Sequence, residues 1–132
     1  MPLPIGHLEK VRALAICDRV LAVGGVRAGS RSSLSLYDFV GEKPLASIEL
    51  PAHVLGLVAD KAGVIAACSD GALRWFALPG GAAEREVAAH DGAINAVALF
   101  GQVLVTAGQD GIVRTFSRAD GSALRSFTVS SR

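Results

Sequence analysis

An internal repeat of forty residues sets the architecture open to this chain. The segment LVADKAGVIAACSDGALRWFAL, residues 57–78, aligns without a gap with VALFGQVLVTAGQDGIVRTFSR, residues 97–118. A fainter third copy, residues 7–25, aligns with residues 90–108 and then carries about four extra residues before LSLYDF. Repeats of this length are typical of stacked structural units, each of which buries its apolar face against a neighbour.

Within each copy, short apolar segments alternate with turn signals, a pattern typical of β-strands. Asp70-Gly71 and Asp110-Gly111 lie at the same place in two copies. Asp-Gly between apolar runs favours a tight hairpin, because glycine tolerates the positive φ that such turns need. Each copy is therefore predicted to be a four-stranded antiparallel meander, and the fold class is all-β. In the last copy we expect the strands at 93–99, 103–109, 112–118 and 123–129.

The inner strands predict how these sheets are arranged. Segments such as INAVALF and VLVTAG are apolar or small on both faces, as in a sheet whose two faces are both covered. Sheets stacked face to face around an axis provide this cover, and that arrangement is the β-propeller. We expect one domain over residues 1–132 with three blades, at residues 7–50, 51–89 and 90–129.

The pattern resembles the WD-repeat family of β-propellers, which has about 40 to 45 residues and four strands per blade. The resemblance covers residues 7–129 and is best in the third copy. By similarity to the family, His90, Thr106 and Asp110 match three members of the hydrogen-bonded tetrad that braces a blade. Phe116 replaces the fourth member, a Trp.

The tetrad pattern weakens in the other two copies. The second copy keeps Asp70 but has Leu50 in the histidine position and Ala66 in the hydroxyl position, so the resemblance implies no tetrad there. The first copy keeps His7 but has Val23 in the hydroxyl position and no Asp at the turn. Family resemblance therefore rests more on period, turns and strand order than on the tetrad.

A histidine, a hydroxyl and a carboxylate also make up a hydrolase triad. A nucleophile needs an exposed, strained setting with an oxyanion hole, whereas Thr106 lies inside a regular strand with no Gly-x-Ser-x-Gly elbow. The repeat explains the same residues as a structural brace. We therefore expect no catalytic residue and no enzymatic activity.

Charge and cysteine usage argue against several other classes. Thirteen basic and twelve acidic residues give a net charge of +1 without basic blocks, so no nucleic-acid partner is expected. No apolar run approaches the roughly 18 residues of a transmembrane helix, and no membrane role is expected. Cys17 and Cys68 lack metal-ligand spacing, so the sequence predicts no metal, no cofactor and a reducing, cytoplasmic setting.

The loops between strands are the predicted binding elements, since loops on rigid scaffolds commonly carry binding. We expect GGVRAGSRSS, residues 24–33, to be an elongated loop; it lacks the Lys-Ser/Thr step and the helix of a phosphate-binding loop. Trp75 is predicted to pack between blades. The residues predicted to contact a partner are Arg27, Arg31, His53, Asp70, Asp91 and Gln109.

Three blades cannot close a ring, and the outer faces of the first and last blades would stay exposed. Two copies about a two-fold axis would place the third blade of each against the first blade of the other, giving six blades. The sequence thus predicts a half propeller that homodimerises and acts as a protein–protein interaction scaffold. Two alternatives stay open: a fragment or half of a longer propeller completed by another chain, and a six-bladed propeller with a small-molecule-binding or hydrolytic channel site.

Overall fold

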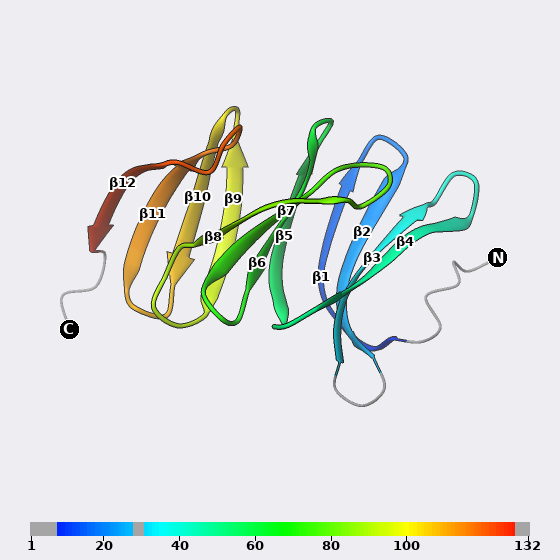
Figure 1. Cartoon of the computed structure of the whole chain (residues 1–132), viewed down its shortest axis with the longest axis horizontal. Coiled ribbons are helices and arrows are strands. Elements are labelled where there is room, and N and C mark those ends of the chain that lie inside the picture. Colours follow the sequence, from blue (N-terminus) through cyan, green and yellow to red (C-terminus); the bar gives the residue numbers. More distant parts are fainter. Residues whose placement is uncertain (1–7, 28–30, 129–132) are drawn as a thin grey trace.

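The computed structural model describes residues 8–27 and 31–128, which form twelve strands and contain no helix (Figure 1). The strands build three four-stranded sheets, and each sheet uses four strands that follow one another in the sequence. Neighbouring strands in each sheet are antiparallel. The expected all-β class and the three antiparallel four-stranded sheets are confirmed. In these residues there is correspondingly no helix of a length and hydropathy suited to crossing a membrane.

The strands follow the predicted units closely. The N-terminal sheet contains β1 (Leu8–Cys17), β2 (Val20–Arg27), β3 (Arg31–Asp38) and β4 (Lys43–Leu50). The middle sheet contains β5 (Val54–Asp60), β6 (Gly63–Cys68), β7 (Ala72–Phe76) and β8 (Ala83–Ala88). The C-terminal sheet contains β9 (Ile94–Phe100), β10 (Val103–Gly108), β11 (Ile112–Ser117) and β12 (Ala123–Thr128). Every strand end in this last sheet lies within one residue of its predicted place; residue 129 falls outside the described residues.

The Asp-Gly turns have the predicted backbone. Gly71 and Gly111 have φ values of 85° and 79°, and each N–H donates to a carbonyl three residues earlier at 3.1 Å. The aspartate before each glycine accepts the backbone N–H of the residue after it, which tightens the turn. Local chemistry therefore determines where these hairpins reverse.

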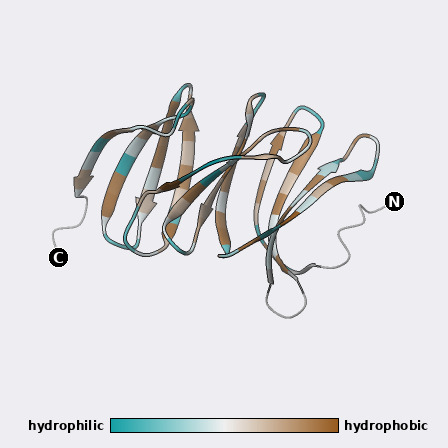
Figure 2. Cartoon of the chain, viewed as in Figure 1, coloured by the Kyte–Doolittle hydropathy of each residue, from teal (hydrophilic) through white to brown (hydrophobic). Residues whose placement is uncertain are grey.

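The core lies between the sheets, and only the middle sheet is covered on both faces. Consecutive β6 residues from Val64 to Cys68 are all 0% exposed, and their side chains point alternately into two apolar clusters. In Figure 2 the hydrophobic segments concentrate in the strands. The first cluster joins the N-terminal and middle sheets through Ala22, Leu34, Leu36, Leu50, Val54, Leu57, Val64, Ala66, Cys68 and Phe76. The second joins the middle and C-terminal sheets through Ile65, Ala67, Leu73, Trp75, Ala89, Ile94, Leu104 and Phe116.

The prediction of an elongated loop at residues 24–33 is wrong for most of this range. β2 continues through Arg27, β3 begins at Arg31, and Gly24 pairs with Leu34 within the ladder. A Cβ on Gly24 would lie 2.6 Å from Val54 Cγ1, so glycine here lets the strand pass close beneath the middle sheet. The glycines of this stretch therefore allow close packing inside a longer hairpin. Residues 28–30 lie outside the described residues.

Candidate functional site

One edge of the molecule collects the turns and connections that the sequence predicts to bind partners. The β6–β7 and β10–β11 turns, the β4–β5 and β8–β9 connections, and the ends at which β2 stops and β3 starts lie along the lower edge in Figure 1. We call this the turn edge. Arg27 and Arg31 are backbone ladder partners at the end of β2 and the start of β3. By the strand bounds, all six predicted contact residues belong to these turns, connections or strand ends: Arg27, Arg31, His53, Asp70, Asp91 and Gln109.

A hydrogen-bonded chain braces the turn edge in the C-terminal sheet. His90 Nδ1 lies 3.0 Å from Asp110 Oδ1, and His90 Nε2 lies 2.7 Å from Thr106 Oγ1. A carboxylate only accepts hydrogen bonds, so Nδ1–H donates to Asp110, while Nε2 and the threonine hydroxyl form the second bond. Thr106 is 0% exposed, in the middle of β10, and Phe116 is buried in the second apolar cluster. These buried groups tie the β8–β9 connection to the β10–β11 turn.

The electrostatics of Asp110 follow from this brace. Burial disfavours the charged carboxylate, but hydrogen bonds from His90 and from the backbone N–H of Ile112 outweigh it and lower the pKa of Asp110. Its second oxygen accepts the N–H of Asp91 at 3.3 Å, so this predicted contact residue is tied to the brace through its backbone. Gln109 similarly bonds Ala93 across the edge. The turn edge is thus held by bonds between neighbouring turns.

The middle sheet has a different brace, which sequence reasoning missed. Arg74 makes two hydrogen bonds to Asp70, at 3.1 and 2.8 Å, and a third to Glu86 at 3.1 Å. The Arg74 side chain is 8% exposed, and its hydrogen bonds hold the pKa of Asp70 below its usual value. A guanidinium therefore binds the turn carboxylate in the repeat whose histidine position holds Leu50. Arginine recurs at 74 and 114, one repeat apart, but this spacing by itself does not point to a brace.

His53 and Asp70 line a shallow pocket on the turn edge. The pocket has a volume of about 390 Å³. His53 Nδ1 lies 2.6 Å from Ser32 Oγ, and its backbone N–H donates to Ser69 Oγ at 3.0 Å. The histidine therefore links the N-terminal sheet to the middle sheet at the turn edge. The pocket is lined by Ser32, Leu50, Pro51, Ala52, His53, Ser69 and Asp70.

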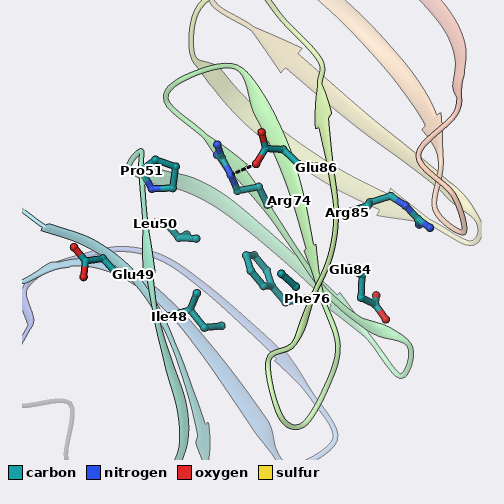
Figure 3. Close-up of a pocket in the computed structure, with 10 residues that line it drawn as sticks. Ile48, Glu49, Leu50, Pro51, Arg74, Phe76, Glu84, Arg85 and Glu86 are labelled. Atoms are coloured by element: carbon teal, nitrogen blue, oxygen red, sulfur yellow. Dashed lines mark hydrogen bonds and ion pairs between the residues drawn. The ribbon is translucent and has the colours of Figure 1, made fainter.

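A second groove of about 440 Å³ runs along the side between β4 and β8 (Figure 3). Ile48 and Leu50 lie on its β4 side, and Phe76 and the Arg74–Glu86 ion pair lie on the opposite side. Arg85 points away from the groove, toward the C-terminal sheet. Among the described residues no group of three or more histidine, cysteine, aspartate or glutamate side chains is placed to bind a metal ion.

The outward faces of the two end sheets are the other notable surface. Ala13 and Ala15 pack toward the middle sheet, so the alternate residues Leu14 and Ile16 point outward and are 61% and 55% exposed. On the C-terminal sheet, the side chains of Phe100 and Phe127 point outward and are 83% and 54% exposed. Both end sheets therefore expose apolar side chains on the face that the middle sheet does not cover.

The contact between the middle and C-terminal sheets shows how a covered face is built. Arg118 binds Asp60 through two hydrogen bonds, at 2.9 and 2.7 Å, and lowers the pKa of that carboxyl. Trp75 is 1% exposed and donates its indole N–H to the Arg118 carbonyl at 3.0 Å. Arg85 lies over the Trp75 ring, 5.7 Å from its centroid, and donates to the Ala119 carbonyl. The predicted packing of Trp75 between sheets is confirmed.

Comparison with known proteins yields structural similarity alone. No family model and no curated protein matches the chain. The crystal structure of the computationally designed Ika4 protein is similar with a TM-score of 0.83 and 20% identity, over 96% of this chain and 76% of that one. The designed Ika8 protein, in a P63 crystal packing, has a TM-score of 0.78 and 19% identity, over 89% of this chain and 36% of that one. At such identities the likeness concerns the fold, and it is consistent with a propeller-like arrangement of the three sheets.

Proposed function

We propose that this chain is a WD-repeat-like half propeller that homodimerises into a closed six-bladed ring and acts as a non-catalytic scaffold for protein–protein interaction. The observation that carries the proposal is the contrast between the sheets. The middle sheet is buried on both faces, whereas Leu14 and Ile16 on one end sheet and Phe127 on the other are more than half exposed. Monomers rarely leave such faces uncovered, and a second copy covers both at once.

The scaffold role rests on the turn edge. Two kinds of brace, His90 with Thr106 and Asp110, and Arg74 with Asp70 and Glu86, hold adjacent turns in place. Rigid turns present side chains with little ordering cost on binding, which favours recognition of a protein or peptide surface. The forty-residue period and the His90 brace support kinship with WD-repeat propellers. The cytoplasmic setting belongs to the same proposal, since both cysteines are free thiols.

Burial of the brace residues also supports a non-catalytic role. Thr106 is 0% exposed and His90 is 8% exposed, so a substrate has no path to this hydroxyl in the folded sheet. Buried polar groups that are fully hydrogen-bonded stabilise a particular turn geometry instead.

The mass of the purified chain in solution tests the proposal. Multi-angle light scattering on a sizing column is expected to give about twice the monomer mass of 13.6 kDa. A mass of one chain would refute the homodimer and support the alternative in which another chain supplies the missing blades. A mass of three chains would refute the six-bladed ring.

A further inference from the structure

Two structurally equivalent positions of each repeat lie where neighbouring sheets meet. The first position is the last residue of the first strand, which pairs with the first residue of the second strand in all three sheets. The second lies two residues after the aromatic residue that ends or nearly ends the third strand. At each contact the first position comes from the earlier sheet and the second from the later one. The first positions are Cys17, Asp60 and Phe100, and the second are Phe39, Leu78 and Arg118.

At the contact between the middle and C-terminal sheets, these two positions form an ion pair. The middle sheet contributes Asp60 and the C-terminal sheet contributes Arg118, which form a bidentate ion pair. The N-terminal sheet contributes Cys17 and the middle sheet contributes Leu78, which packs against the first apolar cluster. One contact is thus charge to charge, and the other has two apolar side chains at these positions. The two members of the series that have no counterpart inside the chain are Phe100, 83% exposed, and Phe39, 38% exposed.

A second series of equivalent positions points the same way. Gly81 and Gly121 have φ values of 81° and 75°, and each sits against the preceding sheet. A Cβ on Gly121 would meet Val87, Trp75 and Arg85, and one on Gly81 would meet the three equivalent residues Ile48, Leu36 and Ala46. These close approaches show that the two contacts share one geometry.

The N-terminal sheet has Glu42 at this position, with a φ of 55° and an exposed side chain. On the outward face of the C-terminal sheet, Thr115 and Arg125 occupy the places of Trp75 and Arg85. Inside the chain Gly121 lies against Trp75. In a contact between two copies, Glu42 would lie against the much smaller Thr115. Arg125 would supply the opposite charge to Glu42. Phe127 takes the place of the smaller Val87 on the same face, so the two open faces are complementary at this position in charge.

We propose that the outward face of the C-terminal sheet binds the outward face of the N-terminal sheet of a second copy, with Phe100 against Phe39 and Arg125 against Glu42. This inference rests on the homodimer proposed above and specifies its contacts. The second copy is the occupant because the interface continues, position by position, the two sheet contacts already present within the chain. A two-fold dimer contains this head-to-tail contact twice.

Charge substitution at the phenylalanine pair tests the contact. Phe100→Asp places an uncompensated carboxylate in each contact and removes a buried ring, so we expect the dimer dissociation constant to rise on the order of 100-fold. Phe39→Arg is expected to weaken the dimer in the same way. Mixing the two variants should restore a dimer, because one contact then reproduces the Asp60–Arg118 pair and the other is the original phenylalanine pair. Masses are measured by light scattering across a dilution series.

Gln102→Glu is the matched control, since it adds the same charge in the same turn on an exposed side chain. The backbone carbonyl of Gln102 accepts the backbone N–H of Arg118 within the chain, and this substitution leaves that bond in place. Circular dichroism confirms that each variant keeps its β-structure. Unchanged dimerisation of Phe100→Asp, or failure of the mixture to restore a dimer, would overturn the head-to-tail contact while leaving a dimeric wild type intact. A monomeric wild type would overturn the homodimer and this contact together.

Discussion

The buried hydroxyl of Thr106 gives a quantitative test of the C-terminal brace. Thr106→Val keeps the side-chain shape but removes the hydroxyl that lies 2.7 Å from His90 Nε2. The His90 side chain is 0% exposed, so water cannot replace the lost partner. An unsatisfied buried polar atom costs about 1–3 kcal/mol. At about 2.1 cal/mol/K of unfolding entropy per residue, a chain of 132 residues loses roughly 4 °C in Tm per kcal/mol.

We therefore expect Thr106→Val to lower Tm by about 4–11 °C. The assay is thermal and urea denaturation at one fixed protein concentration, because dimerisation makes Tm depend on concentration. Thr106→Ser, which keeps the hydroxyl, is the control. Thr106→Val should be less stable than Thr106→Ser by the contribution of the hydrogen bond. A Thr106→Val protein within about 0.5 kcal/mol of wild type would refute the reasoning.

Three further predictions concern the other braces and turns. Arg74→Met should lower the free energy of unfolding by about 1–2 kcal/mol, a modest loss because the partners Asp70 and Glu86 are partly exposed. Arg114→Met should cost less, because Arg114 Nε is buried without a hydrogen-bond partner. Urea denaturation midpoints of the two variants test this order. Arg118 lowers the pKa of Asp60, so the stability that the ion pair contributes is complete above the unfolded pKa of about 3.9 and is lost as pH falls through the lower folded pKa. In Asp60→Asn the urea midpoint should therefore fall less than in the wild type between about pH 5 and 2. The same fall in both proteins would contradict the ion pair. Gly71→Ala should destabilise by at least about 1 kcal/mol, because φ is 85° and a Cβ would press on a backbone carbonyl, whereas Gly80→Ala, with open space around it, should be close to neutral in thermal denaturation.

Strands and turns were predictable because the signals are local. Asp110-Gly111 determines a reversal through the positive φ of glycine and the bonds of the aspartate to its own turn, and the apolar runs on either side pair from there. The prediction of a loop at residues 24–33 was wrong because it, too, used only local signals. Glycine and serine suggest a loop when read locally, but Gly24 is needed where β2 passes close to Val54 in another sheet.

The His90 brace was accessible from the sequence because a repeat pattern pointed to its residues. The Arg74 brace was not, since an arginine four residues after an aspartate is common and gains meaning only when the hairpin brings it back to the turn. The Asp60–Arg118 pair joins residues 58 positions apart, and no periodicity links them. Such contacts depend on how whole sheets are stacked.

The repeat, the strand alternation and the Asp-Gly turns alone determine that this chain forms three four-stranded sheets, because backbone preferences and the two-residue period of a strand act over a few residues. Which face of each sheet is covered follows from the stacking. Val64 and Ile65 are equally apolar neighbours, yet they belong to different cores because sheets lie on both sides of β6. Phe100 and Asp60 occupy equivalent places, but one is exposed and the other is paired, because burial and pairing depend on the neighbouring sheet, which local sequence does not encode.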